Sequence, residues 1–384
     1  MKKAIVVGGA SGIGLALAEE LMEKKYLVYI FDQKKPIFEN NHYIDKFKFY
    51  PCQLLDQDYY DLKELSKDLE VDTLILTAGF GRVCEFDELS MTEIDRLIRV
   101  NALANIQIIK LFYTRISSSK NFYTAVMGSI AGLVSSPLFS VYAASKAAIC
   151  RAIESINIEL EMQGVSNRIL NVSPGSIKGT CFNGNQTELQ KLKPLANCIL
   201  KQMVQRNTLY IPDYAKTFQH VIEEYHKSAH DFGLQSYQYK MQSGRKSNKH
   251  SDRIGYLSGT FDLFHIGHLN LLRRAKAQCD YLIVGVHPDA SHKGKQTFIP
   301  FDERKEIVGS IKYVNKVVES CREDSDAWNL WHYDVLFVGS DYKGSDRFNQ
   351  YEKILRKKGV EIVYFPYTKS TSSTQIRETI LKSK

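Results

Sequence analysis

Two pairs of side chains in this sequence have the residue types and the spacing for chemistry. The first pair is Tyr142 and Lys146, which lie four positions apart and therefore share one face of a helix. A tyrosine phenol has a pKa of about 10, and a neighbouring ammonium stabilises the phenolate and lowers that pKa. The pair can exchange a proton with a substrate oxygen. The hydroxyl of Ser129, just after a strand-like run, could hold the same oxygen.

The second pair is His265 and His268. These histidines follow an apolar, strand-like run at 253–257 and open a helix-like run at 269–278. Imidazoles on the first turn of a helix can hold phosphate oxygens, because the backbone amides and the dipole at a helix N-terminus also favour anions. Gly259 lets the main chain approach a ligand closely. The spacing therefore predicts a phosphate-binding turn between a strand and a helix.

A glycine-rich turn near the N-terminus predicts a dinucleotide site. The turn joins a strand-like run to an amphipathic helix at 15–24, and a second strand ends at Asp32. Pyrophosphate can lie over the N-terminus of such a helix, and a carboxylate after the second strand accepts hydrogen bonds from a ribose 2′-hydroxyl while it repels a 2′-phosphate. NAD(H) is therefore favoured over NADP(H), with Lys34 and Lys35 close by. The turn residues assigned to this cofactor are Gly8, Ser11, Gly12, Ile13 and Gly14.

Length and composition are those of a soluble globular protein. The chain has 384 residues, which is too long for one ordinary core, and 44% of them are hydrophobic. No apolar run approaches the ~20 residues that span a bilayer, so we expect no membrane association. The net charge of +8 comes without a base-stacking or groove-reading motif, so we expect no nucleic acid; a solvated surface explains the charge, as do anionic substrates. The seven cysteines show no metal-ligand or disulfide spacing, which indicates a reducing cytoplasm and no protein-held metal.

Strand-like and helix-like runs alternate along the chain. This alternation predicts an α/β fold of two doubly wound, parallel-sheet, Rossmann-like domains, which we place at 1–233 and 253–384. Residues 234–252 are polar, basic and without a period, and we interpret them as a linker. The strand-like runs are 3–7, 27–31, 47–51, 72–78, 123–127, 254–258, 281–286, 334–338 and 361–365.

Residues 1–230 resemble the short-chain dehydrogenase/reductase family. The match rests on the glycine-rich turn, on the tyrosine–lysine pair with its serine, and on short pieces elsewhere, which are Ala78-Gly79, Asn101, Pro174-Gly175, Ile177 and Thr180. The resemblance implies that Ala78, Gly79, Lys146, Pro174, Gly175 and Ile177 contact the dinucleotide. The family's asparagines before Ala78 are Leu76 and Thr77 here, and Gln53 stands where an adenine-contacting aspartate is usual.

The same resemblance implies how the residues take part in a carbonyl reduction. Tyr142 is the proton donor, and Ser129 polarises the carbonyl. Lys146 holds ribose hydroxyls and lowers the pKa of the tyrosine. Asn101 anchors a water in a proton relay, and the segment 174–180 covers the nicotinamide.

Residues 254–380 resemble the small nucleotidyltransferases typified by glycerol-3-phosphate cytidylyltransferase. Their G-T-F-D-x-x-H-x-G-H sequence is present without a gap from Gly259 to His268. The resemblance implies transfer of a cytidylyl group from CTP to a phosphorylated alcohol, with loss of pyrophosphate and with the help of Mg²⁺. The catalytic residues that it implies are His265, His268, Lys293 and Arg304, with Arg304 in contact with phosphate. The nucleotide-binding residues that it implies are Gly259, Thr260, Phe261, His265, His268, Lys293, Asp341, Ser372, Ser373 and Thr374.

Two positions near the C-terminus depart from the cytidylyltransferase pattern. Tyr367 stands where an arginine is usual, and Ser370 replaces a glycine. Arg377 could supply the missing charge, as it does in related adenylyltransferases. Adenylyl transfer therefore stays open beside cytidylyl transfer.

The order of the two domains suggests two successive reactions. We expect the first domain to reduce a ketose phosphate to an alditol phosphate and the second to couple the product to CTP. CDP-ribitol from ribulose 5-phosphate is the leading example and CDP-glycerol the next, as precursors of teichoic acid or capsule polysaccharide in a bacterial cytoplasm. One alternative is a reductase that acts on a nucleotide-linked keto sugar after activation, and another makes one domain a catalytically silent module. Both families associate through helices, so we expect a homo-oligomer, a dimer or a tetramer, through residues 92–115 and 142–163.

Overall fold

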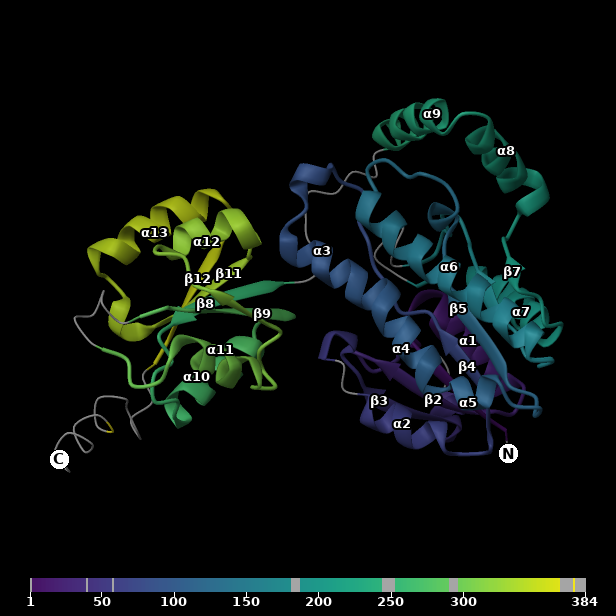
Figure 1. The fold of residues 1–384 in the computed structure, drawn as a ribbon, viewed down its shortest axis with the longest axis horizontal. Helices are drawn as coiled ribbons and strands as arrows, with labels where there is room; N and C mark the ends of the chain where they lie inside the picture. Colours follow the sequence, from purple (N-terminus) through teal and green to yellow (C-terminus); the bar gives the residue numbers. More distant parts are fainter. Residues whose placement is uncertain are drawn as a thin grey trace. The chain divides into compact units, whose positions relative to one another are not determined.

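The computed structural model describes residues 2–38, 41–56, 59–180, 187–243, 253–289, 296–366 and Ile376. The described residues up to Ser243 form one compact unit, except for three at 90–92, and those from Arg253 onwards form the body of a second. Each unit is a parallel sheet with helices on both faces (Figure 1). The predicted fold class is therefore confirmed for both units.

The sheet of the first unit has the strand order β3-β2-β1-β4-β5-β6-β7, and all of its described pairings are parallel. The order reverses between β1 and β4, and a crevice opens beyond the carboxyl ends of strands at such a point. The strands are β1 (Lys3–Val7), β2 (Leu27–Asp32), β3 (Phe47–Pro51), β4 (Val71–Leu76), β5 (Tyr123–Met127), β6 (Ile169–Val172) and β7 (Leu209–Tyr210).

Two hydrophobic cores lie on the two faces of this sheet. Because successive side chains of a strand point to opposite faces, Ala4 and Val6 of β1 pack with α1 and α7, whereas Ile5 and Val7 pack with α2, α4 and α6. Strands buried on both faces explain the nearly continuous apolar runs in the sequence. The helices are α1 (Gly12–Glu23), α2 (Tyr60–Ser66), α3 (Met91–Ile98), α4 (Ala104–Leu111), α5 (Tyr113–Ile116), α6 (Ser140–Met162) and α7 (Leu189–Val204).

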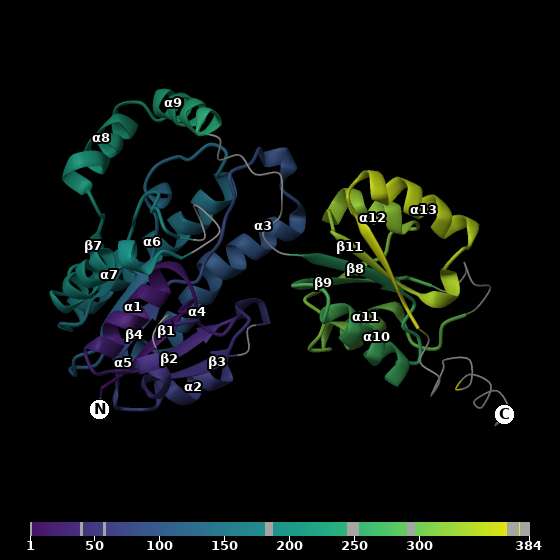
Figure 2. The same cartoon turned by 180° about the vertical axis from the view of Figure 1, so that it is seen from behind.

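Two further helices follow β7, and Figures 1 and 2 show them as an arm beyond the sheet of the first unit. They are α8 (Gln219–Lys227) and α9 (Ala229–Gln242). Residues 234–242, predicted as part of a linker, instead form the second part of α9. The Ser228 hydroxyl starts this helix by accepting a hydrogen bond from the Asp231 N–H over 3.2 Å. The other predicted domain limits stay predictions.

The second unit repeats the arrangement on a smaller scale, with the order β10-β9-β8-β11-β12. Helices α10 and α11 cover one face of the sheet and α12 and α13 cover the other (Figure 1). The strands are β8 (Ile254–Gly259), β9 (Tyr281–Val286), β10 (Lys316–Glu319), β11 (Val335–Gly339) and β12 (Glu361–Phe365). The helices are α10 (Ile266–Lys276), α11 (Phe301–Gly309), α12 (Asp324–Trp331) and α13 (Asp346–Lys357).

No helix in the described part of the chain has the length and apolar character needed to cross a membrane.

A buried asparagine ties together the connections that lead into β5 and β6. Asn167 is 1% exposed. Its side-chain oxygen accepts a hydrogen bond from the Phe122 N–H over 3.0 Å, and its amide nitrogen donates to the carbonyl oxygens of Ile116, Ser118 and Lys120 at 2.9–3.0 Å. One side chain therefore satisfies main-chain groups that the loop cannot satisfy by itself.

We expect Asn167→Ala to lower the free energy of unfolding of the first unit by about 2–4 kcal/mol, because buried main-chain groups lose a hydrogen-bond partner. Urea unfolding followed by circular dichroism measures the loss. The tryptophans, Trp328 and Trp331, report the second unit by fluorescence and provide an internal reference. Asn197→Ala, at an exposed site on α7, is the matched control and should change stability by less than about 0.5 kcal/mol. Equal stability of the two variants would contradict this account.

Candidate active sites

The glycine-rich turn of the first unit connects the carboxyl end of β1 to α1. Gly8 has a φ of 85°, and a Cβ placed there would lie 2.4 Å from the Ala78 nitrogen after β4. A Cβ at Gly14 would lie 2.1 Å from the Gly8 carbonyl oxygen. Only glycine fits at these two places, so the turn packs directly against neighbouring main chain. The resulting cradle at the N-terminus of α1 fits the pyrophosphate of a dinucleotide.

Asp32, the last residue of β2, holds its carboxylate against this turn. Its Oδ2 accepts a hydrogen bond from the Ala10 N–H over 2.9 Å, and its Oδ1 accepts one from the Gln33 N–H over 2.7 Å. The Gln33 side chain donates in turn to Gln53 Oε1 over 2.7 Å. A carboxylate held in this position could accept hydrogen bonds from the hydroxyls of a ribose.

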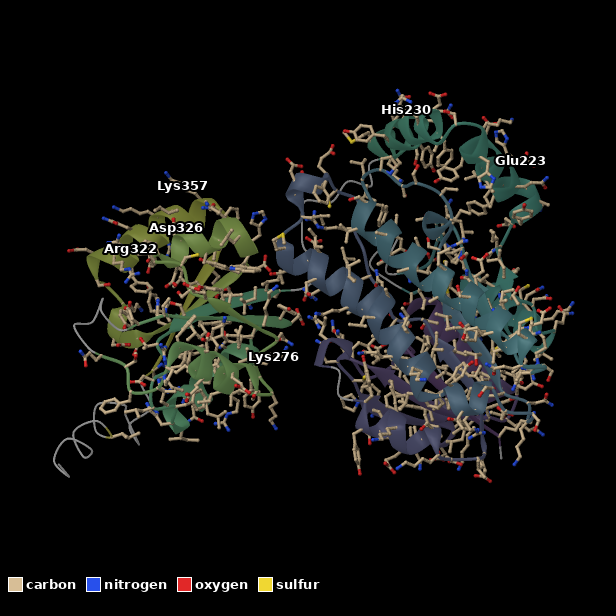
Figure 3. The ribbon with its side chains drawn as sticks, in the orientation of Figure 1. Glu223, His230, Lys276, Arg322, Asp326 and Lys357 are labelled. Carbon is tan, nitrogen blue, oxygen red and sulfur yellow. The ribbon has the colours of Figure 1, made fainter. Side chains whose placement is uncertain are left out.

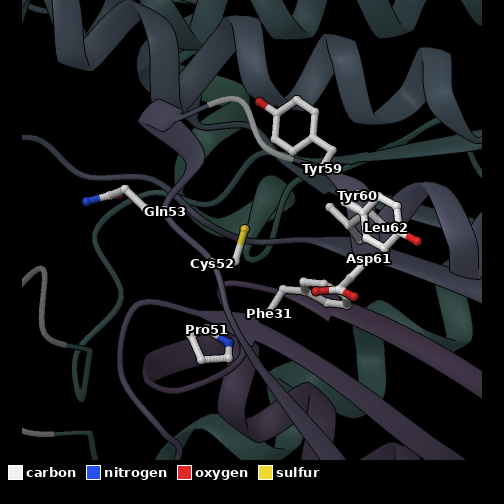
Figure 4. A pocket seen from close by; sticks show the side chains of 8 residues that line it. All are labelled: Phe31, Pro51, Cys52, Gln53, Tyr59, Tyr60, Asp61 and Leu62. Atoms are coloured by element: carbon white, nitrogen blue, oxygen red, sulfur yellow. The ribbon is translucent and has the colours of Figure 1, made fainter. Parts of the chain in front are cut away.

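A hollow of about 290 Å³ opens at the carboxyl ends of β2 and β3 (Figure 4). Figure 4 shows the ring of Tyr59 across the hollow from Pro51 and Phe31. Aromatic and apolar side chains of this kind could hold a flat base such as adenine. The residues that line the hollow are Phe31, Pro51, Cys52, Gln53, Tyr59, Tyr60, Asp61 and Leu62.

The segment after β6 returns to the glycine-rich turn. The Ile130 N–H donates to the Pro174 carbonyl oxygen over 3.0 Å, and the Thr180 hydroxyl donates to the Ile177 carbonyl oxygen over 2.9 Å. Thr180 lies 3.8 Å from the place of a Cβ at Gly12. The segment that the resemblance assigns to the nicotinamide therefore begins beside Ser129 and ends beside α1.

Thr187 makes a contact that nothing in the sequence indicated. Its Oγ1 accepts a hydrogen bond from the Gly12 N–H over 2.9 Å, although the two residues lie 175 positions apart. A phosphate oxygen on the N-terminus of α1 would accept from the same donors. Thr187 and a bound dinucleotide therefore compete for this N–H.

The tyrosine–lysine pair lies on the first turns of α6, and Ser129 follows β5. Lys146 Nζ lies 5.8 Å from the centre of the Tyr142 ring and donates to the Met127 carbonyl oxygen over 2.8 Å. The Ser129 side chain is hydrogen bonded to the Tyr142 side chain, and it also accepts from the Ala131 N–H over 3.2 Å. The structure therefore brings the three predicted residues together around one hydroxyl.

Asn101 lies in a turn of π-helix at Arg99–Leu103, between α3 and α4. Its amide nitrogen donates to the Phe80 carbonyl oxygen over 2.8 Å, and its amide oxygen accepts from the Phe80 N–H over 3.0 Å. A Cβ placed on Gly79 would lie 3.1 Å from Asn101 Oδ1 and 3.2 Å from Lys146 Nζ. Single turns of π-helix are frequent at functional sites. This one places the Asn101 side chain beside Gly79, where the Lys146 ammonium also lies.

Burial shifts the pKa values of both Tyr142 and Lys146. Burial raises the pKa of Tyr142 to about 12, although the bond from Ser129 acts in the opposite direction. Burial lowers the pKa of Lys146 to about 8. The effect of burial on Tyr142 therefore outweighs the predicted lowering of its pKa, and the Lys146 ammonium is directed at the Met127 carbonyl oxygen. Tyr142 is a protonated phenol at neutral pH, which is the form that donates a proton.

In the second unit, the two histidines occupy the first turn of α10, as their spacing predicts. The ring centres of His265 and His268 lie 4.0 Å apart. The Gly267 N–H donates to His265 Nδ1 over 3.0 Å, and the His265 N–H donates to His268 Nδ1 over 3.4 Å. Because each Nδ1 accepts a hydrogen bond, the proton of each neutral ring lies on Nε2. Burial lowers the pKa of His265, which favours this neutral form. Both rings can therefore present an N–H to a phosphate oxygen.

The turn between β8 and α10 has strained backbone angles and is held in place by the hydrogen bonds of Asp262. Phe261 and Leu263 have φ angles of 52° and 51°, in a region that side-chain-bearing residues seldom adopt. Asp262, between them, is 4% exposed and accepts hydrogen bonds from the N–H groups of Phe298 and Ile299 at 3.0–3.1 Å. Strain of this kind persists only where the surroundings enforce it, and it is frequent at functional sites. Asp262 therefore holds this turn against the residues that precede α11.

Arg304 is fully buried and has a different task from the predicted one. Its guanidinium donates to four carbonyl oxygens, those of Ile299, Thr260, His287 and Pro288, at 2.5–2.9 Å. These contacts join α11 to the carboxyl ends of β8 and β9. The predicted contact with phosphate finds no support in this geometry, because four of the five N–H groups of the guanidinium are directed at the main chain. Arg304 positions the turn that carries the histidines.

Thr260 and Asp341 are two further polar residues near this turn. The buried hydroxyl of Thr260 has no hydrogen-bond partner among the residues that the structure describes. Asp341 follows β11, and its Oδ1 would lie 2.4 Å from a Cβ on Gly339. Both residues lie at the carboxyl edge of the sheet. Lys293, Ser372, Ser373 and Thr374 lie outside the described residues.

Asp324 belongs to a polar cluster that the sequence analysis missed. It is 7% exposed, and burial raises the pKa of its carboxyl group despite a hydrogen bond with the Ser258 side chain. The Asp324 N–H donates to the Tyr351 hydroxyl over 3.1 Å, and the Tyr333 hydroxyl donates to the Asp324 carbonyl oxygen over 2.8 Å. The cluster supports the last residues of β8. No local pattern could reveal it, because its members come from three separate elements and one connection.

Comparisons with known protein families match the two units separately. A family model described as short chain dehydrogenase matches residues 2–191, and one described as cytidylyltransferase-like matches residues 256–379. The recognition of both families is therefore confirmed.

Individual proteins are similar to parts of the chain. Glycerol-3-phosphate cytidylyltransferase of Bacillus spizizenii is 36% identical over 124 residues, which cover 31% of this chain and 91% of that protein. An uncharacterized oxidoreductase of Saccharomyces cerevisiae is 27% identical over 204 residues, or 50% of this chain and 65% of that protein. Among solved structures, a short-chain dehydrogenase from Streptomyces avermitilis has 18% identity and a TM-score of 0.48 over 63% of this chain and 97% of that chain.

The ionisation of Lys146 predicts a pH profile for carbonyl reduction. In the folded protein the pKa of this group falls from 10.5 to about 8, so it is an ammonium below that pH and a neutral amine above it. We expect kcat/KM for reduction to fall as the pH rises through about 8, while Tyr142 stays protonated. Lys146→Met should lower kcat/KM by about 100-fold or more and remove this limb. If kcat/KM of the variant still falls at the same pH, a group other than Lys146 causes the fall.

The contacts of Arg304 predict a loss confined to the second unit. Lysine has one ammonium and cannot reach the four carbonyl oxygens, so we expect Arg304→Lys to lower nucleotidyl transfer by at least about 100-fold through loss of positioning. Carbonyl reduction by the same protein should not change. Arg273→Lys, at an exposed position on α10, is the matched control. Transfer at the wild-type rate by Arg304→Lys would show that the main-chain contacts are dispensable.

Proposed function

The chain belongs to the cytidylyltransferase-like family through residues 256–379 and carries a short chain dehydrogenase domain in front of them; on this premise we propose that it makes a CDP-alditol in two successive steps. The first unit is an oxidoreductase and the second a nucleotidyltransferase. The observation that carries the proposal is the presence, in one chain, of a site with a proton-donating phenol and a site with two phosphate-directed imidazoles. A reduced carbonyl becomes an alcohol, and a phosphorylated alcohol is what the second family activates.

The first step is reduction of a ketose phosphate to an alditol phosphate, with ribulose 5-phosphate as the leading substrate. NADH supplies the hydride to the carbonyl carbon. The Ser129 hydroxyl holds the carbonyl oxygen, and Tyr142 gives its phenolic proton to that oxygen as the negative charge develops. The ammonium of Lys146 stabilises the tyrosinate that remains. NADH is proposed over NADPH because the Asp32 carboxylate, held by two main-chain N–H groups, would repel a 2′-phosphate.

The second step joins the alditol phosphate to CTP. A phosphate oxygen of the alditol phosphate attacks the α-phosphorus of CTP, the bond from that phosphorus to the bridging oxygen of the β-phosphate breaks, and pyrophosphate leaves. The Nε2–H groups of His265 and His268 donate to phosphate oxygens that gain charge. We propose Mg²⁺ as a partner of the triphosphate, since this ion binds mainly through substrate phosphates and a few oxygen ligands. The name of the Bacillus relative supports glycerol 3-phosphate as the next acceptor to test.

The surface of α6 supports the proposal of a homo-oligomer. Ile158 is 60% exposed and Met162 is 82% exposed, one helical turn apart on this helix. Apolar side chains that lie together on a helix surface commonly mark a contact with another chain. A bacterial cytoplasm and a role in teichoic acid or capsule precursors stay proposals as well.

The proposal predicts separate losses for the two sites. We expect the purified protein, with ribulose 5-phosphate, NADH, CTP and Mg²⁺, to release CDP-ribitol and pyrophosphate, detected by mass spectrometry. Tyr142→Phe should abolish NADH oxidation yet still couple added ribitol 5-phosphate to CTP. His268→Ala should do the reverse, accumulating ribitol 5-phosphate.

Two results would contradict the proposed order. One is NADH oxidation that starts only after CTP is added, because the reductase would then act on a nucleotide-linked keto sugar. The other is the absence of any CDP product across a panel of ketose phosphates and alditol phosphates. Replacing CTP with ATP is the control for the base, and a faster reaction with ATP would make the second unit an adenylyltransferase.

A further inference from the structure

Helix α9 lies against the loops that frame the catalytic tyrosine. The first of these loops, residues 79–85, follows β4, and the second, residues 133–139, precedes α6. Figure 3 labels His230 on α9 and Glu223 on the neighbouring helix α8, and both residues are exposed. The contacts of α9 with the two loops are made by Gly233, Tyr237 and Lys240.

The contact with the second loop is made by Lys240. Its ammonium donates to the Ser136 hydroxyl over 2.6 Å and to the Pro137 carbonyl oxygen over 2.8 Å. The same ammonium lies 5.8 Å from the centre of the Phe139 ring, within the range of a cation–π contact. The helix also approaches this loop with its backbone, since a Cβ on Gly233 would lie 4.0 Å from Pro137 Cγ.

The contact with the first loop is made by Tyr237. Its hydroxyl donates to Glu85 Oε1 over 2.7 Å. Glu85 is itself fixed, because its N–H donates to Glu88 Oε2 over 3.0 Å. The two loops are joined to each other as well, by the Cys84 N–H, which donates to the Leu138 carbonyl oxygen over 2.9 Å.

These loops form a wall beside Tyr142. The Phe139 ring lies 4.8 Å from the Tyr142 ring, centre to centre. A Cβ on Gly81 would lie 2.5 Å from Tyr142 Cδ2 and 3.2 Å from Phe139 Cε1. The position of Phe139 therefore limits the space next to the phenol that gives its proton to the substrate.

Leu138, next to this phenylalanine, has an unfavourable backbone conformation. Its φ is 63°, in the left-handed region where a leucine is strained. Such a conformation persists only where surrounding contacts enforce it. The Cys84 N–H holds the Leu138 carbonyl oxygen, and Lys240 holds that of Pro137 just before it. Lys240 thus stabilises the strained turn that directs Phe139 toward Tyr142.

We propose that α9 is part of the substrate-binding wall of the reductase and that Lys240 is a positioning residue, which sets the space for the ketone by holding Phe139 against Tyr142. This proposal rests on the proposed function in so far as the substrate is a ketose phosphate. The reductase site would then include α9, which comes after the last strand of the first sheet and before the first strand of the second.

Steady-state kinetics of the full-length protein test the proposal. We expect Lys240→Met to raise KM for the ketone about tenfold, the effect of losing one charged hydrogen bond. kcat should fall less than KM rises, and the dissociation constant of NADH, measured by fluorescence, should stay the same. Lys240→Arg keeps a donor for both oxygens and should stay within about twofold of the wild type. Lys227→Met, on the exposed side of α8, is the matched control.

Amide hydrogen exchange provides a measurement that needs no substrate. We expect faster exchange at 133–139 in Lys240→Met than in Lys227→Met or the wild type. Unchanged exchange together with an unchanged KM would overturn the proposal. A rise in KM confined to phosphorylated ketones, without faster exchange, would also overturn it, because Lys240 would then bind the phosphate directly. If the wild type reduces no ketose phosphate, the proposed function fails, while the exchange experiment still decides whether Lys240 holds the loop.

Discussion

Both units depend on the same constraint, which is that the connections leaving two neighbouring parallel strands run to opposite faces of the sheet where the strand order reverses. The reversal lies between β1 and β4 in the first unit and between β8 and β11 in the second. The glycine-rich turn follows β1 and the histidine turn follows β8, so each phosphate-directed helix N-terminus opens at its reversal point. The order of the strands thereby places two unrelated chemistries at equivalent positions of two sheets.

Each site also depends on a buried cation that is held by main-chain carbonyl oxygens. Lys146 donates to Met127 after β5, whereas Arg304 joins carbonyl oxygens that follow β8 and β9. An ammonium loses its proton more easily when it is desolvated, and burial lowers the pKa of Lys146 to about 8. A guanidinium keeps its charge in proteins, so Arg304 serves as a permanent link. A lysine therefore suits proton chemistry in the first unit, and an arginine suits fixed geometry in the second.

The last helix of the first unit, α9, is more than a connection to the second. Its polar composition and lack of period suggested a linker from residue 234, yet the residues up to Gln242 form α9 and contact both loops beside Tyr142. A helix that packs through one lysine and one tyrosine leaves no apolar periodicity in the sequence. The reductase site is therefore completed by residues that a division of the chain by composition would assign to the linker.

Local patterns in the sequence determined the elements that carry the chemistry. The strands β1, β3, β5, β9 and β12 have the predicted limits. Three of them, β1, β5 and β9, are largely buried, and parallel strands buried on both faces appear as nearly uninterrupted apolar runs. The short strands β6, β7 and β10 and the helix α12 were not predicted, since so few residues show no period of their own. Tyr142 with Lys146, and His265 with His268, were found because residues three or four apart share a helix face.

Only the tertiary structure decided what distant residues do to one another. It turned Arg304 from the predicted phosphate contact into a link between carbonyl oxygens, and it raised rather than lowered the pKa of Tyr142. It also placed Thr187 against Gly12 and Lys240 against the loop before α6. The physical reason is that burial and hydrogen-bond partners are properties of the folded neighbourhood, which brings together segments far apart in the sequence, whereas spacing along the chain determines only which side chains share one helix or one strand.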